Sequence, residues 1–359
     1  MAIKYLSGNR LQGTTAERTA LNLASPTQTS WKEIGRVTLS SNGHTISVTG
    51  LTAKDNIMFL SHQITTGSGR IDGHGTLNGD TGNNYAKREN DNGGSDNVAG
   101  SQATFSTGKG NGAAADNFVI GDILNVASKE KLIITHATGG CATGAGNVPS
   151  RREAVNKWVN TSDAVSSIQV ISGYAGSSDF ATGSELVVLG FDNDEADSGT
   201  NFWQELSSVE LSSGADTITT GATSAISKKY LYVKAVLIAD GNIRTDVRLN
   251  NDSGNNYTRR RSNNGASDST ATGESSIDVL GDSTHDKVVE LFIVNKADKE
   301  KLILGNICYY NSADSAPQRS EFTAKWANTS DLISRITVNN TGASGDYASG
   351  SYIKVWGAD

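Results

Sequence analysis

Hydrophobic residues along the chain occur in short runs or at every second position, and clusters of turn-forming residues separate these stretches. In the first half, the predicted strands are 36–39, 45–48, 57–64, 118–126, 132–135, 168–171 and 186–190. In the second half, they are 230–238, 245–249, 288–294, 302–309, 333–338 and 352–356. No stretch of about 12 or more residues keeps the apolar period of an amphipathic helix. The pattern therefore predicts an all-β protein.

Composition supports many short strands joined by turns. The chain has 359 residues, 39 of them Gly and 3 of them Pro, and 36% of its residues are hydrophobic. Gly and Asn provide the positive φ angles of tight turns. About eight to ten strands in each half fit either a closed barrel or a two-sheet sandwich. We favour a jelly roll, because the long polar stretches after Tyr85 and Tyr257 suit loops that cross between sheets.

The sequence contains the same unit twice. The matching pairs are 31–34 with 203–206, 78–85 with 250–257, 127–134 with 297–304, 157–163 with 325–331, and 179–184 with 346–351. Collinear matches over about 160 residues indicate a duplicated domain, because solenoid repeats have periods of only about 20–50 residues.

The repeat sets the predicted domain boundaries. They are an N-terminal arm at 1–28, a first jelly-roll domain at 29–192, an acidic linker at 193–200 and a second jelly-roll domain at 201–359. Nothing ahead of Trp203 matches the arm, in which 16–23 could form a short helical turn. Since the second copy has no such arm, we expect the arm to gain order on a neighbouring subunit. Its candidate contact residues are Tyr5, Leu6, Arg10, Arg18 and Leu21.

Charge and special residues exclude several classes of protein. The net charge of −7 argues against a nucleic-acid partner. The basic run 259–261 is short, and we expect it on the exposed face of a strand or loop. Cys141 and Cys308 form neither a metal-binding pair motif nor a disulfide framework. No apolar run reaches about 18 residues and no export signal is visible, so we expect a soluble protein without membrane insertion.

The chain carries no recognisable catalytic motif. It has no nucleophile elbow, zinc motif or Walker loop. The acids shared by the two copies are Asp80/Asp252, Asp96/Asp268, Glu130/Glu300, Glu153/Glu321, Asp163/Asp331 and Asp179/Asp346. A pair of them could hydrolyse a glycoside across a cleft. Their settings are typical of turns and caps, however, so we predict a protein that is not an enzyme.

Two equivalent loops are the candidate binding sites. The first contains Asp80, Asn83 and Tyr85, and the second contains Asp252, Asn255 and Tyr257. Their oxygen-rich side chains could bind Ca²⁺, although the spacing favours a turn motif, and we predict no other cofactor. Either tyrosine could stack on a sugar, although packing is the favoured use of the ring. The tryptophans shared by the copies, 31 with 203 and 158 with 326, are predicted to pack in the core or between sheets.

Several of these segments resemble a known class of proteins. The opening 1–10 with 16–19 is similar to the start of virion proteins from marine phages and archaeal viruses. The stretches 251–257, 325–329, 333–336, 348–350 and 355–357 resemble β-sandwich domains of tail-fibre and capsid-associated proteins.

The resemblance implies a non-enzymatic virion component, assembled in the host cytoplasm. Such a component would be a capsid, capsid-decoration or fibre protein, and a double-jelly-roll capsid protomer is an equal possibility. Its implied partners are further copies of itself, other virion proteins and host-surface glycans. The alternative function is a carbohydrate-binding module, free-standing or at the working end of the same virion protein, or a host-glycan receptor-binding protein.

Overall fold

The structure is a computed structural model, and it describes residues 31–67, 71–108, 115–139, 141–173, 178–193, 201–309, 316–342 and 344–359. The N-terminal arm lies outside these residues, together with its candidate contacts Tyr5, Leu6, Arg10, Arg18 and Leu21. The expected helical turn at 16–23 and most of the acidic linker also lie outside them. Within the described residues, no helix is long and apolar enough to cross a membrane.

The first domain is a two-sheet sandwich. Its strands are β1 (Lys32–Thr38), β2 (Thr45–Thr49), β3 (Asn56–Gln63), β4 (Gly73–Leu77), β5 (Tyr85–Asp91), β6 (Asn97–Gln102), β7 (Phe105–Ser106), β8 (Asn117–Leu124), β9 (Lys131–Gly139), β10 (Ser150–Trp158), β11 (Ser167–Ser172) and β12 (Glu185–Phe191). The large sheet has the order β1-β12-β3-β8-β9-β10-β5-β6, and the small sheet has the order β2-β11-β4-β7.

The second domain repeats this arrangement. Its elements are β13 (Gln204–Glu210), β14 (Thr217–Thr219), the 3₁₀ turn η1 (Ser224–Ile226), β15 (Tyr230–Leu237), β16 (Ile243–Leu249), β17 (Tyr257–Asn263), β18 (Ser269–Glu274), β19 (Ile277–Ser283), β20 (Lys287–Val294), β21 (Lys301–Tyr309), β22 (Gln318–Trp326), β23 (Ile336–Asn340) and β24 (Tyr352–Ala358). Its large sheet runs β13-β24-β15-β20-β21-β22-β17-β18 and its small sheet β14-β23-β16-β19.

Each domain has its own core between its two sheets. Side chains along β11 alternate between buried and partly exposed, so one face of the small sheet packs inward. Phe59, Phe105 and Trp158 fill the first core, and Phe322, Trp326 and Tyr347 occupy the second. The chain crosses repeatedly between large and small sheets, and the strand pairs are antiparallel. The prediction of two all-β, jelly-roll-like sandwich domains is confirmed.

Some details of the prediction were wrong. The polar stretches after Tyr85 and Tyr257 are not crossing loops but the hairpins β5–β6 and β17–β18. Asn92 and Gly93 both have positive φ, as a tight hairpin turn requires, and 264–265 repeat this Asn-Gly turn. That Asn-Gly signal could have predicted both hairpins. The strand expected at 333–338 is β23, which begins three residues later at Ile336.

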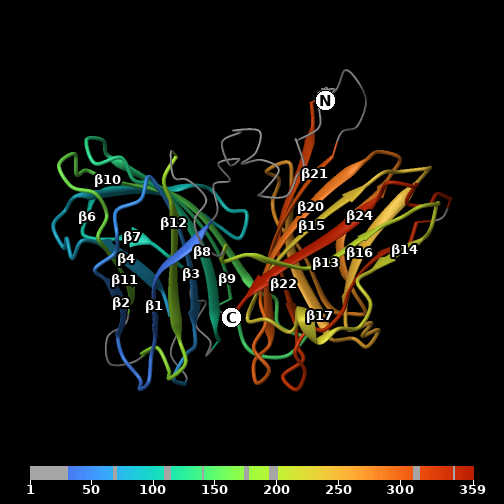
Figure 1. Cartoon of the computed structure of the whole chain (residues 1–359), viewed down its shortest axis with the longest axis horizontal. Coiled ribbons are helices and arrows are strands. Elements are labelled where there is room, and N and C mark those ends of the chain that lie inside the picture. Colours follow the sequence, from blue (N-terminus) through green and yellow to red (C-terminus); the bar gives the residue numbers. More distant parts are fainter. Residues whose placement is uncertain are drawn as a thin grey trace, which may run out of the picture.

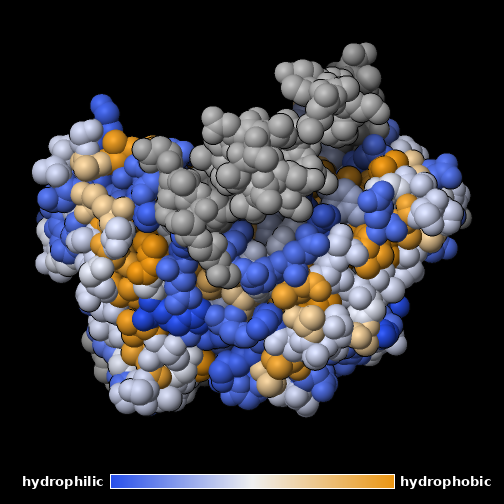
Figure 2. Space-filling model, in the orientation of Figure 1, coloured by the Kyte–Doolittle hydropathy of each residue, from blue (hydrophilic) through white to orange (hydrophobic). Residues whose placement is uncertain are grey.

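The two domains lie side by side and face each other through their large sheets (Figure 1). Strands β8 and β9 of the first domain are near β21 and β22 of the second, whereas the small sheets lie on the far sides (Figure 1). In the space-filling view the described surface along the lower part of this junction is largely hydrophilic (Figure 2). A binding site at this junction would combine side chains from both domains.

Candidate functional site at the domain junction

An apolar cluster joins the two large sheets. It contains Met58, Leu60, Phe118, Ile120, Val187 and Leu189 from the first domain and Phe202, Trp203, Tyr230, Val294, Leu302, Leu304 and Ala358 from the second. The rings of Phe118 and Tyr230 stack at 6.1 Å between centroids. Burying apolar area of this kind is what stabilises permanent interfaces. Trp203 packs between sheets, as expected, but the two sheets belong to different domains, because its ring lies in this junction.

A buried carboxylate ties the two domains together at the junction. Glu185 of β12 accepts hydrogen bonds from the Tyr230 hydroxyl at 2.9 Å and from Arg36 Nη1 at 3.0 Å, and Lys229 Nζ lies 2.8 Å away. Burial alone would raise the pKa of Glu185, but the hydrogen bonds from Lys229 and Thr38 and the nearby cations lower it below its ordinary value. The carboxylate is therefore charged and paired across the two domains.

The turn between β9 and β10 extends this contact onto the second domain. Lys325 Nζ donates to the carbonyl oxygen of Ala142 at 2.8 Å, and the amide of Gly144 donates to Glu300 at 2.5 Å. Further along, Arg151 Nη2 lies 2.6 Å from Asp268 Oδ1, and both side chains are almost fully buried. These directional contacts fix one relative orientation of the domains.

The junction covers different parts of the two equivalent faces. Leu302 of β21 is 3% exposed, whereas its counterpart Leu132 of β9 is 55% exposed. Leu304 is 7% exposed and its counterpart Ile134 is 47% exposed. The contact is therefore asymmetric, because a two-fold contact would bury equivalent residues equally.

The uncovered parts of the two faces differ in character. In the second domain the uncovered positions include Lys234, Glu290 and Lys354, which stand where the first domain has the buried residues Leu60, Ile120 and Val187. In the first domain Lys157 is also uncovered, but four of the uncovered positions are apolar. They are Leu124, Leu132, Ile134 and Val155, and we refer to these four residues as the outer patch. An exposed cluster of apolar side chains on one sheet face is typical of a protein contact site.

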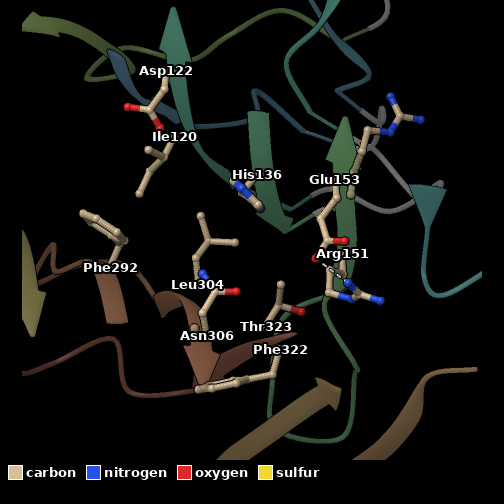
Figure 3. A pocket seen from close by; sticks show the side chains of 12 residues that line it. Ile120, Asp122, His136, Arg151, Glu153, Phe292, Leu304, Asn306, Phe322 and Thr323 are labelled. Atoms are coloured by element: carbon tan, nitrogen blue, oxygen red, sulfur yellow. Dashed lines mark hydrogen bonds and ion pairs between the residues drawn. The ribbon is translucent and has the colours of Figure 1, made fainter. Parts of the chain in front are cut away.

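A groove between the domains runs beside the outer patch. One cavity of about 170 Å³ is lined from the first domain by Ile120, Asp122, His136 and Glu153 and from the second by residues that include Phe292 (Figure 3). A neighbouring cavity of about 320 Å³ adds Ile134 and Val155 of the outer patch and Arg319 and Glu321 of the second domain.

The titratable groups in this groove are desolvated. Burial raises the pKa of Asp122 to about 6. Burial also lowers the pKa of His136, although the neighbouring Glu153 works in the opposite direction. Glu153 in turn accepts a hydrogen bond from Arg151 Nη1 at 2.5 Å. In Figure 3, Asp122 and His136 point toward the space between the domains. The groove thus combines apolar walls with both carboxyl and guanidinium groups, a surface that suits a peptide with apolar and charged side chains.

The loops predicted to bind a glycan or Ca²⁺ hold the core tryptophans. Asp80 accepts hydrogen bonds from Trp158 Nε1 at 2.7 Å and from the Gly82 amide at 2.8 Å. Asp252 repeats both contacts with Trp326 and Gly254 at the same distances. These donors match the turn motif favoured from the sequence. Ca²⁺ binding stays a prediction, and within the described residues no group of three or more His, Cys, Asp or Glu side chains could hold a metal ion.

The two candidate sugar platforms are in the core. Tyr85 is 1% exposed and stacks on Trp158 at 6.3 Å, and its hydroxyl accepts a hydrogen bond from the Leu77 amide. Tyr257 has the equivalent place beside Trp326. Neither ring presents a face to solvent, so both are packed, which is the use that the sequence favoured over sugar stacking. Asn83 and Asn255 are exposed at the loop tips and are not brought together with the groove.

The basic run 259–261 is not the exposed strand face that its sequence suggested. Arg259 and Arg261 point between the sheets and contact Asp278, with side chains 11% and 12% exposed. Arg260 points the other way, and its Nε donates to the carbonyl oxygen of Pro149 in the first domain at 3.0 Å. Alternation along β17 therefore divides the run between an internal cluster and the domain junction.

The fold and the junction define a protein of two β-sandwich domains joined by an asymmetric contact. No family model matches the chain, and neither does any curated protein. Among solved structures, domains LG4-5 of the mouse laminin alpha1 chain align at 11% identity over 92% of this chain and 91% of that one, with a TM-score of 0.20. An acyl-CoA hydrolase from Agrobacterium tumefaciens aligns at 9% identity over 61% and 74% of the two chains, with a TM-score of 0.10.

Proposed function

We propose that this chain is a non-enzymatic structural protein that assembles with further copies of itself. The observation that carries the proposal is the outer patch. Four apolar side chains of one sheet face, each about half exposed, lie at positions whose counterparts in the second domain are buried or polar. A soluble sheet that faced water alone would alternate buried apolar with exposed polar residues. The outer patch therefore supports a contact with another protein.

The proposed occupant of the groove is the N-terminal arm of a neighbouring copy. Its sequence combines Tyr5, Leu6 and Leu21 with the cations Arg10 and Arg18. The groove offers apolar side chains from the outer patch together with Asp122, Glu153 and Glu321, and it is also lined by Arg88, Arg151 and Arg319. The match of apolar side chains supports the pairing, whereas Glu153 and Glu321 are already paired with Arg151 and Arg319. We extend the proposal to a virus particle on the resemblance of the sequence to virion proteins.

The experiment compares the oligomeric state of the full-length chain with that of an outer-patch variant. Mass photometry of the unaltered chain is expected to give a closed oligomer or larger assembly. The double substitution Leu132→Ser with Ile134→Ser is expected to give monomers that melt at nearly the same temperature, since both side chains are about half exposed. Val98→Ser is the matched control, because Val98 is 60% exposed and lies on the edge strand β6. A monomeric unaltered chain, or a variant that assembles as well as the control, would refute the proposal.

A further inference from the structure

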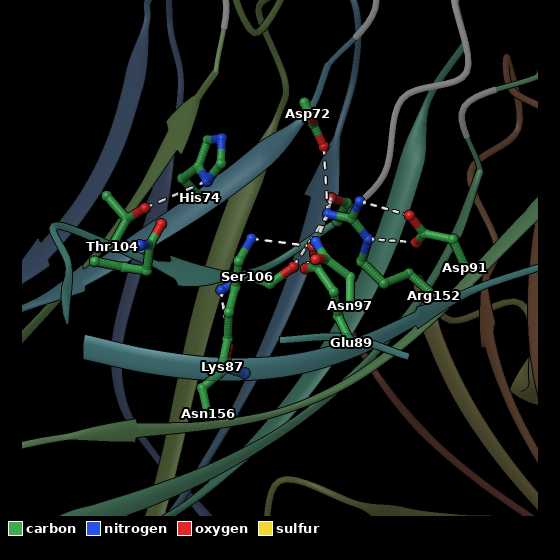
Figure 4. A network of polar contacts seen from close by, with 12 residues as sticks. Asp72, His74, Lys87, Glu89, Asp91, Asn97, Thr104, Ser106, Arg152 and Asn156 are labelled. Atoms are coloured by element: carbon green, nitrogen blue, oxygen red, sulfur yellow. Dashed lines mark hydrogen bonds and ion pairs between the residues drawn. The ribbon is translucent and has the colours of Figure 1, made fainter. Parts of the chain in front are cut away.

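The first domain buries one arginine among carboxylates (Figure 4). Arg152 Nε and Nη2 donate to the two oxygens of Asp91 at 2.7 and 3.0 Å, and Arg152 Nη1 lies 3.3 Å from Asp72. Nη1 also donates to Ser106 Oγ at 3.1 Å, and Glu89 lies 3.6 Å away. All three guanidinium nitrogens therefore have acceptors, as a buried charge requires.

The same place in the second domain has the opposite charge arrangement. The strand registers identify the counterpart of each residue, since β5, β7, β10 and β4 correspond to β17, β19, β22 and β16. The replacements are Ser320 for Arg152, Asn263 for Asp91, Arg261 for Glu89, Arg259 for Lys87, Arg244 for Asp72 and Asp278 for Ser106. Arg152 and Lys87 among three acids have become three arginines around Asp278, with Asp246 as a second nearby acid.

Asp278 is shared by all three guanidinium groups. Its Oδ2 accepts from Arg259 Nη2 at 2.9 Å and from Arg244 Nη2 at 3.2 Å, and its Oδ1 accepts from Arg261 Nη1 at 3.3 Å. One carboxylate offers about four lone-pair directions, whereas each guanidinium carries five N–H groups. The cluster therefore has more donors than acceptors.

The excess donors are buried. Nε and Nη1 of Arg259, Nε of Arg261 and Nε of Arg244 have no hydrogen-bond acceptor among the described residues. The second nearby acid, Asp246, lies 3.8 Å from Arg244 Nε, and burial raises its pKa. Burial and the charge of Arg259 lower the pKa of Arg261, whereas Asp278 works in the opposite direction. Unsatisfied buried N–H groups are costly unless a ligand accepts from them.

We propose that Arg244, Arg259 and Arg261 form a binding site for a small tetrahedral oxyanion, a phosphate or sulfate group. The planar guanidinium fork matches the oxygens of such an anion in pairs. Arg244 is 43% exposed, whereas Arg259 and Arg261 are nearly buried, so the anion enters from the Arg244 side. The site belongs to the second domain, because in the first domain the carboxylates of Asp72, Glu89 and Asp91 occupy this place.

The first test is binding of inorganic phosphate and sulfate to the full-length chain. Thermal melting and isothermal titration calorimetry are run against sodium chloride of equal ionic strength. We expect both anions to raise the melting temperature, and Arg244→Gln to weaken their affinity about tenfold or more, since a charge-assisted pair is removed. Arg88→Gln is the matched control, because Arg88 is 56% exposed and paired with Asp96 in the first domain. The Arg88→Gln variant should bind both anions as tightly as the unaltered chain does.

A second variant tests whether the three guanidinium groups need a negative charge between them. Asp278→Asn removes the carboxylate that the three guanidinium groups share, so it should lower the melting temperature in chloride. Phosphate should then restore more stability to this variant than it adds to the unaltered chain. A structural role alone would give no phosphate-specific rescue. The proposal is overturned if phosphate and sulfate stabilise no more than chloride, or if Arg88→Gln weakens binding as much as Arg244→Gln.

The source of the oxyanion is separated by a further comparison. Galactose 6-sulfate is titrated beside inorganic sulfate, with galactose as the control. Tighter binding of the ester than of the free ion, with no binding of galactose, identifies a sulfated glycan as the ligand. Binding of the inorganic ions alone identifies a free anion. Either result supports the site, and both are independent of the oligomeric state that tests the assembly proposal.

Discussion

Leu302 and Leu132 provide a direct test of the asymmetric junction. Each is the second residue of its strand, β21 or β9, and each follows a buried lysine. Leu302 is 3% exposed within the junction, whereas Leu132 is 55% exposed. Truncation of a fully buried leucine to alanine costs about 2–5 kcal/mol, and a half-exposed leucine loses a small part of that. We therefore expect Leu302→Ala to cost about 3 kcal/mol and Leu132→Ala less than about 1 kcal/mol.

The assay is urea unfolding of both variants in parallel, followed by tryptophan fluorescence. The chain has 5 tryptophans, and Trp203 lies in the junction while Trp158 and Trp326 lie in the two cores. Because Leu302→Ala removes a buried side chain from the junction, its unfolding midpoint should shift to a lower urea concentration. The midpoint of Leu132→Ala should stay close to that of the unaltered chain. Equal costs for the two substitutions would refute the asymmetric contact. Leu132→Ala should instead weaken self-association, which the same sample shows in mass photometry.

Three further predictions follow from single contacts. Asp80→Ala leaves the buried Trp158 Nε1 without its acceptor and should lower the unfolding free energy by about 1–3 kcal/mol, measured by urea unfolding, with Asp80→Asn losing less. The pKa of Glu185 lies below its ordinary value of 4.5, so its ionised carboxylate contributes fully to the free energy of unfolding above pH 4.5, and this contribution is lost as the pH falls further. In an acid titration followed by urea unfolding, Glu185→Gln should therefore lose less unfolding free energy than the unaltered chain. Deletion of 1–28 should leave the melting of both domains unchanged but weaken assembly in mass photometry, and normal assembly would contradict the role of the arm.

The fold could be predicted from the sequence because its signals are local or repeated. Strand alternation and the paired motifs at 78–85 and 250–257 required no knowledge of contacts between distant residues. The same motifs explain why Asp80 and Asp252 hold their tryptophans in the same way. The two hairpins were predictable as well, since the Asn-Gly pairs at 92–93 and 264–265 are strong turn signals.

The groove and the arginine cluster could not be predicted in this way. Leu132 and Leu302 lie in almost the same local sequence, Lys-Leu-Ile, so no local pattern distinguishes the exposed leucine from the buried one. Their difference depends on how two domains pack, which involves residues more than a hundred positions apart. Likewise, Arg261 meets Asp278 only because β17 and β19 belong to facing sheets. A basic run on a strand is ordinarily solvated, so the sequence alone did not indicate that Arg259 and Arg261 point between the sheets.

The asymmetry of the junction gives a physical reason for assembly. A two-fold contact between two copies would use the same positions twice and could cover the apolar part of each face. The observed contact instead sets Phe118 and Ile120 of the first domain against the Leu302 and Leu304 region of the second. The equivalent region of the first domain, the outer patch, is then left about half exposed, with no partner among the described residues. Because its side chains stay apolar while the uncovered face of the second domain is charged, the outer patch is the surface at which burial by another copy gains the most free energy.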